Sequence, residues 1–221
     1  GLLASEAPAP RQQTAPTSFV VYFDDGPFPT SATTRDDATF VGLTALVRHM
    51  ELPYSDATAA GTFTIRGPAG TLIATVDDQR LMIDGQALEL GRAPFREDGD
   101  WFVPTEFLTS GLERITGVDF QYEPGARRIL AGTLTATRLA ISAVGNEGET
   151  RLTLRSDVSI NIRVQQFPEE NRVVLAIDQA PINPTAEVLT YRDASIRSIR
   201  FDDADGRSRI LVETTPQVSS V

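Results

Sequence analysis

The sequence predicts a mainly β protein with two short helices, in which a duplicated strand-helix-strand α+β domain precedes a small all-β antiparallel sandwich. Short extended runs bounded by Gly, Pro or Asp recur before Gly132, and two stretches carry apolar residues at helical spacing. After Gly132 apolar and polar residues alternate almost throughout. A chain of 221 residues is long enough for two domains. We expect these domains at residues 18–133 and 134–221.

Residues 1–17 are expected to form a flexible tether, because they are rich in Ala, Pro, Gln and Thr and lack apolar periodicity. The first six residues suggest a cloning-scar glycine followed by a signal-peptide remnant, which favours export to the periplasm or cell envelope. The longest apolar runs, such as Val173–Ile177, are strand-sized and far shorter than the roughly 20 residues of a membrane helix. We therefore expect no transmembrane segment.

The first repeat unit begins with predicted strands at 19–23 and 39–41. Leu43, Leu46, Val47 and Met50 follow at i, i+3, i+4 and i+7, which predicts a short amphipathic helix ending near Pro53. A further strand is predicted at 62–65.

The second unit repeats this plan. Strands are predicted at 72–76, 81–83 and 101–103, and Pro104 is expected in the first turn of a helix. Gly117 is expected to end that helix, whose apolar stripe consists of Phe107, Leu108, Gly111, Leu112 and Ile115. A hairpin of 119–122 and 127–130 closes the unit. Residues 35–41 correspond to 96–103 with one insertion, and the two units are expected to share one core.

Alternation in the second part predicts antiparallel strands with one apolar face each. The apolar positions are 152 and 154; 158, 160, 162 and 164; 173, 175 and 177; 199 and 201; and 210 and 212. Turn-forming residues separate these runs at 145–148, 168–171 and 203–206.

Composition excludes several classes of chemistry. All 20 basic residues are arginine, so a P-loop lysine and an imine-forming lysine are both missing. The chain has no cysteine, and its one histidine, His49, cannot supply a multi-histidine zinc set. A net charge of -10 opposes nucleic-acid binding.

Two segments resemble known families. The run Asp98-Gly99-Asp100-Trp101-Phe102-Val103-Pro104-Thr105-Glu106-Phe107-Leu108, with 118–122 and 127–130, resembles the copper amine oxidase N-terminal-like domain, a stalk domain of bacterial surface proteins. Residues 150–154 and the run Pro168-Glu169-Glu170-Asn171-Arg172-Val173-Val174-Leu175-Ala176-Ile177-Asp178 resemble the AMIN domain. The first family name implies neither copper nor oxidase chemistry.

This order of domains resembles the non-catalytic N-terminal region of a bacterial N-acetylmuramoyl-L-alanine amidase. The resemblance implies a peptidoglycan-binding or targeting role in cell-wall turnover. The amidase domain of that family uses a histidine-glutamate-histidine zinc set, and nothing in this sequence matches it. The resemblance therefore implies no enzyme activity and no cofactor in this chain, with zinc expected only in a separate catalytic domain.

Other candidate sites have structural interpretations that we favour. His49 lies on the predicted helix and could bind a metal, but a lone histidine on a helix surface is usually structural or solvated. Residues 203–206 resemble half a calcium loop, but Phe201 and Val212 occupy the first and last ligand positions, so a hairpin turn is expected. The pairs Asp24-Asp25, Asp36-Asp37 and Asp77-Asp78 fit turns better than a glycan hydrolase site. Trp101, Phe102 and Tyr122 could form a sugar-stacking platform, but Phe102 is expected in the core.

The candidate binding residues are Arg151, Arg155, Arg163 and Arg172. They fall at polar positions of adjacent predicted strands, where they could project from one sheet face toward carboxylates or phosphates. Residues 134–221 carry 10 Arg and 12 acidic residues, a net of -2, against 10 and 18, a net of -8, in residues 1–133. The structural alternative is a solvated face paired with Glu149, Asp157 and Glu170. The sequence leaves open whether the partner is peptidoglycan or, in a scaffold role, an envelope or division protein.

Overall fold

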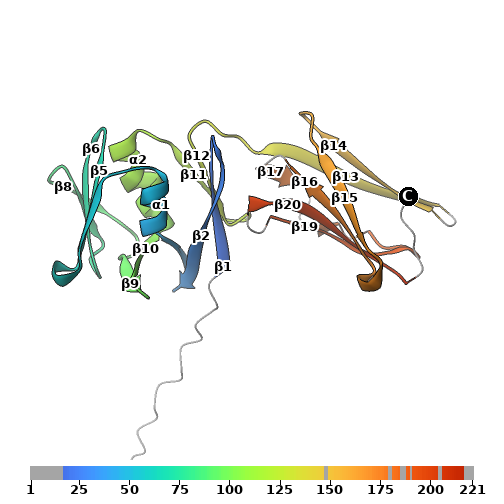
Figure 1. The fold of residues 1–221 in the computed structure, drawn as a ribbon, viewed down its shortest axis with the longest axis horizontal. Helices are drawn as coiled ribbons and strands as arrows, with labels where there is room; N and C mark the ends of the chain where they lie inside the picture. Colours follow the sequence, from blue (N-terminus) through green and yellow to red (C-terminus); the bar gives the residue numbers. More distant parts are fainter. Residues whose placement is uncertain are drawn as a thin grey trace, which may run out of the picture.

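A computed structural model describes residues 17–146, 149–178, 181–184, 188–189, 191–203 and 206–216. Residues 1–16 of the expected tether lie outside this set, and Thr17 already belongs to the first strand. The molecule is elongated, with two sheets and the helices toward one end and two further sheets toward the other (Figure 1). It is mainly β with two short helices, as predicted.

The N-terminal part contains two sheets. The seven-stranded sheet, sheet A, has the order β11-β12-β1-β2-β3-β10-β9. Its strands are β1 (Thr17–Phe23), β2 (Gly26–Arg35), β3 (Ala38–Gly42), β9 (Phe95–Glu97), β10 (Asp100–Pro104), β11 (Phe120–Glu123) and β12 (Arg128–Ala131). Sheet B is an antiparallel meander of β4 (Tyr54–Ala57), β5 (Thr62–Gly67), β6 (Gly70–Thr75), β7 (Arg80–Ile83) and β8 (Gln86–Glu89), with the turn η1 (Thr58–Ala60) after β4.

The helices lie between sheets A and B (Figure 1). They are α1 (Thr44–His49), the π-helical segment η2 (Phe107–Leu112) and α2 (Glu113–Thr116), which continues η2. One buried cluster joins the helix residues Leu46, Phe107 and Ile115 to strand residues from both sheets. The prediction that the two repeat units share a core is confirmed.

Both helices form where the apolar spacing placed them. The backbone N–H of Thr44 donates to Asp100 Oδ1 at 3.2 Å, so β10 caps the start of α1. Gly117 ends α2 in a left-handed conformation, as predicted. The prediction for Pro104 is wrong: it is the last residue of β10, opposite Phe40 of β3, and the helix begins one residue later.

The duplication is visible as two hairpins followed by helices. The β2–β3 turn has positive φ at Asp36 and Asp37, and the β9–β10 turn has positive φ at Asp98 and Gly99, as two-residue hairpin turns require. Strands β3 and β10 pair antiparallel with Val41 opposite Val103, which brings the two repeats together.

The C-terminal part also contains two sheets. Sheet C has the order β14-β13-β17, from β13 (Thr137–Asn146), β14 (Glu149–Ser156) and β17 (Ile182–Pro184). Sheet D has the order β15-β16-β20-β19-β18, from β15 (Ile162–Phe167), β16 (Arg172–Ile177), β18 (Val188–Leu189), β19 (Ile196–Asp202) and β20 (Ser208–Thr214), with the turn η3 (Pro168–Glu170) after β15. The two sheets share a buried cluster, so the sandwich is confirmed. Among its described strand pairs, β13–β17 is parallel and the others are antiparallel.

Two predictions in this part need correction. Val158 and Ile160 precede β15 instead of lying in it, and Val158, Ile162 and Val164 are exposed, so the apolar face of β15 is not buried. The ten-residue strand β13 was not predicted, although Leu139 and Ile141 supply its inner face. The turn at 168–171 forms as expected, with Asn171 left-handed, and residues 147–148 and 204–205 of the other turns lie outside the described residues.

A buried ionic contact joins the two parts of the chain. The Arg128 side chain is 2% exposed and donates to Asp203 Oδ2 at 2.9 Å, to the Ile182 carbonyl at 2.7 Å and to Glu123 Oε2 at 2.7 Å. Tyr22 donates its hydroxyl to the same Asp203, and the pKa of Tyr22 is raised because the phenol is buried beside that carboxylate. Asp203, the residue that follows β19, therefore anchors the sandwich against sheet A.

Candidate functional site

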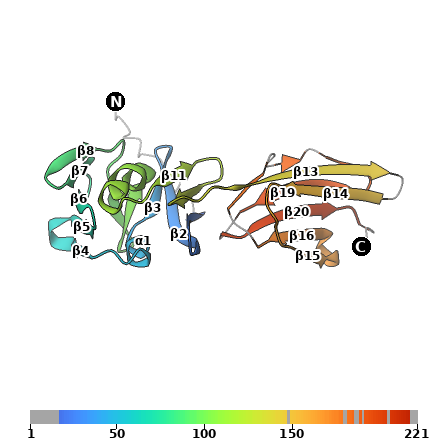
Figure 2. The same cartoon turned by 90° about the horizontal axis from the view of Figure 1, so that it is seen from above.

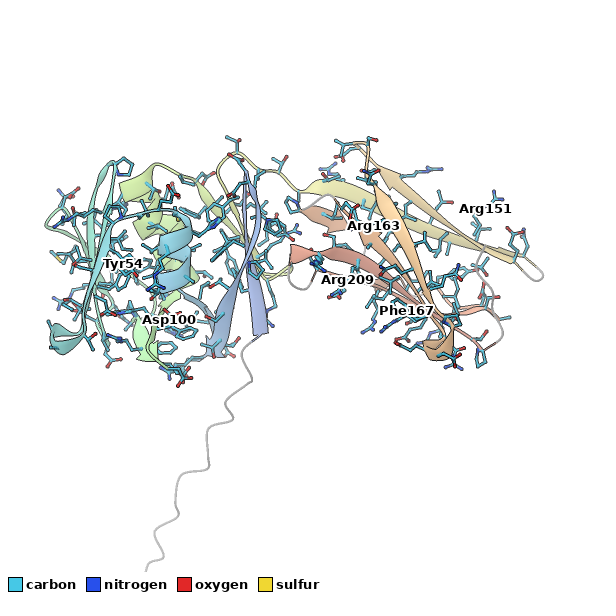
Figure 3. The ribbon with its side chains drawn as sticks, viewed as in Figure 1. Tyr54, Asp100, Arg151, Arg163, Phe167 and Arg209 are labelled. Atoms are coloured by element: carbon cyan, nitrogen blue, oxygen red, sulfur yellow. The ribbon has the colours of Figure 1, made fainter. Side chains whose placement is uncertain are left out.

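The four predicted arginines do not share one sheet face. Arg151 and Arg155 lie on β14 of sheet C, whereas Arg163 and Arg172 lie on β15 and β16 of sheet D. Alternation correctly predicted the outward side of each strand. The prediction of one shared face failed because β14 and β15, although consecutive in sequence, belong to different sheets and do not pair. Figure 3 shows Arg151 near the outer end of the β13–β14 hairpin, well separated from Arg163 and Arg209.

Four arginines at sheet D are each paired with an acid, whereas Arg197, an exposed residue at the bulge of β19, has no ion pair among the described residues. Arg172 lies 2.6 Å from Glu170, Arg209 lies 2.7 Å from Asp202, and Arg200 lies 3.5 Å from Glu213. Arg163 forms an ion pair with Asp178. The structural alternative for the arginines is therefore correct for Arg172 and its partner Glu170. Because the charges within these four ion pairs balance, the four arginines offer little net attraction to an anionic ligand.

The outer face of sheet C is different. Leu152 and Leu154 pack toward the sandwich core, so Arg151 and Arg155 point outward, where both are exposed. Val144 is opposite Arg151, and Ala140 is opposite Arg155. The phase of β13 places exposed Arg138 on the same face, two residues from Ala140. Within the described part of the chain no ion pair neutralises these three arginines.

We call this set, Arg138, Arg151 and Arg155, the sheet C arginine face. The strand positions of this face include one acid, the exposed Glu149, so the formal charge is +3 - 1 = +2. Arg151 and Arg155 are four residues apart on an extended strand, which separates them by roughly 13 Å. Arg138 continues the row by about two residues, giving a track roughly 20 Å long. This arrangement suits a linear anionic polymer.

Sequence reasoning missed Arg138 because β13 was not predicted. The signal was present: Leu139, Ile141 and Ala143 alternate with exposed residues, and the same alternation that placed Arg151 would have placed Arg138.

A local cluster holds the β13–β14 hairpin. Asp193 accepts hydrogen bonds from the hydroxyls of Thr150 and Tyr191 and from the N–H groups of Ser195 and Ile196. The hydrogen bond from the Thr150 hydroxyl lowers the pKa of Asp193 to about 2, and the other donors contribute to this shift. Partial desolvation of the carboxylate opposes it. Gly145 leaves the space for this contact, since a Cβ there would lie 2.7 Å from Asp193 Oδ2. The segment after β18 is thereby attached to the hairpin that carries Arg151.

His49 has a structural environment. Its ring stacks on Phe28 with centroids 4.4 Å apart and lies 4.8 Å from Phe23. The Nε2 atom lies 3.8 Å from Asp25 Oδ1. The aromatic packing supports the structural interpretation.

The acidic pairs lie in turns, and the aromatics belong to the core. Asp36, Asp37 and Asp77 adopt positive φ, which marks tight turns. Trp101 is fully buried, and Phe102 packs with Phe40 and Phe95 in a second buried cluster, as predicted for Phe102. In the region that the structure describes, no three His, Asp or Glu side chains gather as a metal site. None of its helices has the length and apolar character needed to cross a bilayer.

Comparison with known protein families gives two matches. Residues 22–130 match the copper amine oxidase N-terminal domain, and residues 140–221 match the AMIN domain. No curated protein and no solved structure matches the chain. Both families are non-catalytic modules, and AMIN domains are associated with peptidoglycan binding and periplasmic targeting in amidases. The chain therefore contains a segment that matches the copper amine oxidase N-terminal domain and, after it, a segment that matches the AMIN domain, in the order predicted for an amidase N-terminal region.

Proposed function

We propose that this chain is the non-catalytic peptidoglycan-binding region of an exported N-acetylmuramoyl-L-alanine amidase involved in cell-wall turnover. In this proposal the AMIN domain holds the enzyme on the wall, and the copper amine oxidase N-terminal domain acts as a stalk. The AMIN match supports the first role, and the non-catalytic character of the copper amine oxidase N-terminal domain is compatible with the second.

The observation that carries the proposal is the sheet C arginine face. Three exposed arginines without an acidic partner among the described residues stand on one side of a sheet, in a chain whose net charge is -10. Guanidinium groups bind carboxylates and phosphates through paired donors, and wall polymers present such groups repeatedly. Each exposed contact contributes about 1 kcal/mol or less, so retention depends on several contacts to one polymer.

Arg163 and Arg172 have a smaller part in this proposal. Their charges are already matched by Asp178 and Glu170, and an incoming anion would compete with those carboxylates. We therefore assign primary binding to Arg151 and Arg155 with Arg138.

Cosedimentation of the purified chain with sacculi tests the function. We expect the chain to pellet at low salt and to be released progressively as salt increases, because the contacts are exposed ion pairs. A chain that stays in the supernatant at low salt would contradict wall binding and favour a scaffold that docks an envelope or division protein.

Two controls test the non-catalytic part of the proposal. Dye-labelled peptidoglycan incubated with this chain alone should release no dye, whereas release would favour a carboxylate-dependent glycan hydrolase. Dialysis against a chelator should leave sacculus retention unchanged, because the proposed contacts need no metal. Loss of retention that zinc restores would contradict this.

A further inference from the structure

The strand β15 forms an unusually open edge of sheet D. Among the strands that the structure describes, β15 pairs with β16 alone and lies at the edge of the sheet. Among the sheet edges in the described regions, only β14 and β15 are longer than four residues, with eight and six residues. The edge strand β14 carries Glu149, Arg151 and Arg155, charged residues of the kind that discourage edge pairing.

The side chains of β15 also lack cover. Ile162 is opposite Ile177 and Val164 is opposite Leu175, so both point to the side on which those β16 residues are buried in the sandwich core. Sheet C has three strands against five in sheet D, and its cover does not reach this edge. Ile162 is 36% exposed and Val164 is 58% exposed, and Val158 just before the strand is 50% exposed. An apolar strip therefore accompanies the open backbone edge.

The charge on this edge is low. Arg163 is the one charged residue of β15, and its ion pair with Asp178 neutralises it. The edge belongs to residues 134–221, which carry 10 - 12 = -2, whereas residues 1–133 carry 10 - 18 = -8. Figures 1 and 2 show β15 in the C-terminal half of the molecule and the sheets of the N-terminal part in the other half. Two copies can therefore meet at β15 with their acidic ends apart.

We propose that two copies of this chain associate through antiparallel pairing of β15 with β15, with the two-fold axis at Val164. In this register Val164 is opposite its own copy, Ile162 is opposite Gln166, and Arg163 is opposite Gln165. Directly opposed side chains share a face, so the exposed valines and isoleucines of both copies form one apolar strip. No two like charges are opposed. The two five-stranded sheets become one continuous sheet, and each dimer presents two sheet C arginine faces to the wall.

Measurement of mass in solution tests the association. A single strand pair with an apolar strip is a small interface, so we expect a dimer in exchange with monomer at about 0.1 mM. Val164→Lys places like charges opposite each other, and this variant should be monomeric with an unchanged melting temperature because Val164 is exposed. Parent protein that keeps the monomer mass at 1 mM would overturn the proposal.

Cysteine cross-linking tests the register, and the absence of natural cysteine makes it clean. In Val164→Cys the two sulfurs arise from directly opposed residues, whose Cα atoms are about 4.5–5.5 Å apart, within disulfide range. In Gln165→Cys the equivalent Cα atoms are roughly 8 Å apart, too far for a bridge. Ile73→Cys, at an exposed position of β6, reports random collision. We expect rapid oxidation to a covalent dimer only for Val164→Cys. Equal rates for the three variants would overturn the register, and with a monomeric parent they would overturn the association itself.

The association and the wall-binding proposal fail separately. Val164→Lys lies off the sheet C arginine face, so a monomeric variant should still pellet with sacculi, with weaker retention because one face replaces two.

Discussion

Arg128 is almost fully buried between the two parts of the chain, where Glu123 and Asp203 share its charge. Removing one partner of a buried ion pair leaves the other uncompensated and typically costs about 3–5 kcal/mol. We predict that Arg128→Met lowers the free energy of unfolding by that amount, measured by urea denaturation. The double variant Arg128→Met, Asp203→Leu should recover part of the loss.

Arg80→Met is the matched control, because Arg80 pairs with Asp78 on the surface. It should leave the unfolding midpoint unchanged. Equal stability of Arg128→Met and the parent would show that the two parts are not held by this contact.

Asp193 makes stability depend on pH at the residue scale. Its pKa is lowered to about 2 from a usual 3.8, first by the Thr150 hydroxyl bond. A folded-state pKa below the unfolded value stabilises the protein above about pH 4, and this contribution disappears as pH falls from about 4 to about 2.

We therefore predict that Asp193→Asn lowers the melting temperature at pH 6 and that the difference from the parent shrinks toward pH 2. Differential scanning calorimetry across this range measures it. A difference that stays constant with pH would mean that the carboxylate charge is not involved.

At the scale of elements, Gly67 determines how the β5–β6 hairpin meets α2. A Cβ at Gly67 would collide with the backbone carbonyl of Ile115, and the N–H of Ala69 donates to that same carbonyl at 2.9 Å. We predict that Gly67→Ala destabilises the protein by about 1–3 kcal/mol, because a backbone contact cannot relax as a side chain can.

Arg66→Ala, on the exposed side of the same hairpin, is the control and should change stability little. Urea denaturation compares the two variants. Equal midpoints for Gly67→Ala and the parent would show that the hairpin moves freely relative to the helix.

The elements that sequence patterns predicted are those with one clear period. The helix at 43–50 and the strand β5 have apolar residues in one phase, because one face of each meets a core. The strand β2 was missed because Pro27 and Pro29 interrupt its pattern, and sheet pairing with β1 and β3 overrides that local signal. The alternation in β15 correctly predicted which side chains face the sandwich core. Their burial depends on whether sheet C extends over them, and a local sequence pattern contains no information on that.

At the scale of the whole molecule, the candidate site was half predictable. Alternation correctly gave Arg151 and Arg155 a common outward face, since i and i+4 on a strand share a side. It could not show that Arg163 and Arg172 belong to another sheet, because sheet membership depends on which strands pair across long separations. Nor could it show which arginines are neutralised, since the Arg209–Asp202 and Arg200–Glu213 pairs are made across strands.

The two sheets provide a matched comparison of paired and unpaired arginines. Arg138, Arg151 and Arg155 lie outward on sheet C, and Arg163, Arg172 and Arg200 lie outward on sheet D with acidic partners. Replacing either set with glutamine removes the same formal charge of three from the whole chain. A difference in sacculus retention between the two triple variants therefore shows which sheet face binds, because both variants have the same net charge.

The most direct test is sacculus cosedimentation of these two triple variants beside the parent at one low salt concentration, with melting temperatures confirming that all are folded. We predict that Arg138→Gln, Arg151→Gln, Arg155→Gln abolishes retention, at least tenfold less protein in the pellet, since three contacts of up to about 1 kcal/mol each are lost together. The sheet D variant should pellet nearly as well as the parent. Equal retention of both variants, or loss only with the sheet D variant, would contradict the account.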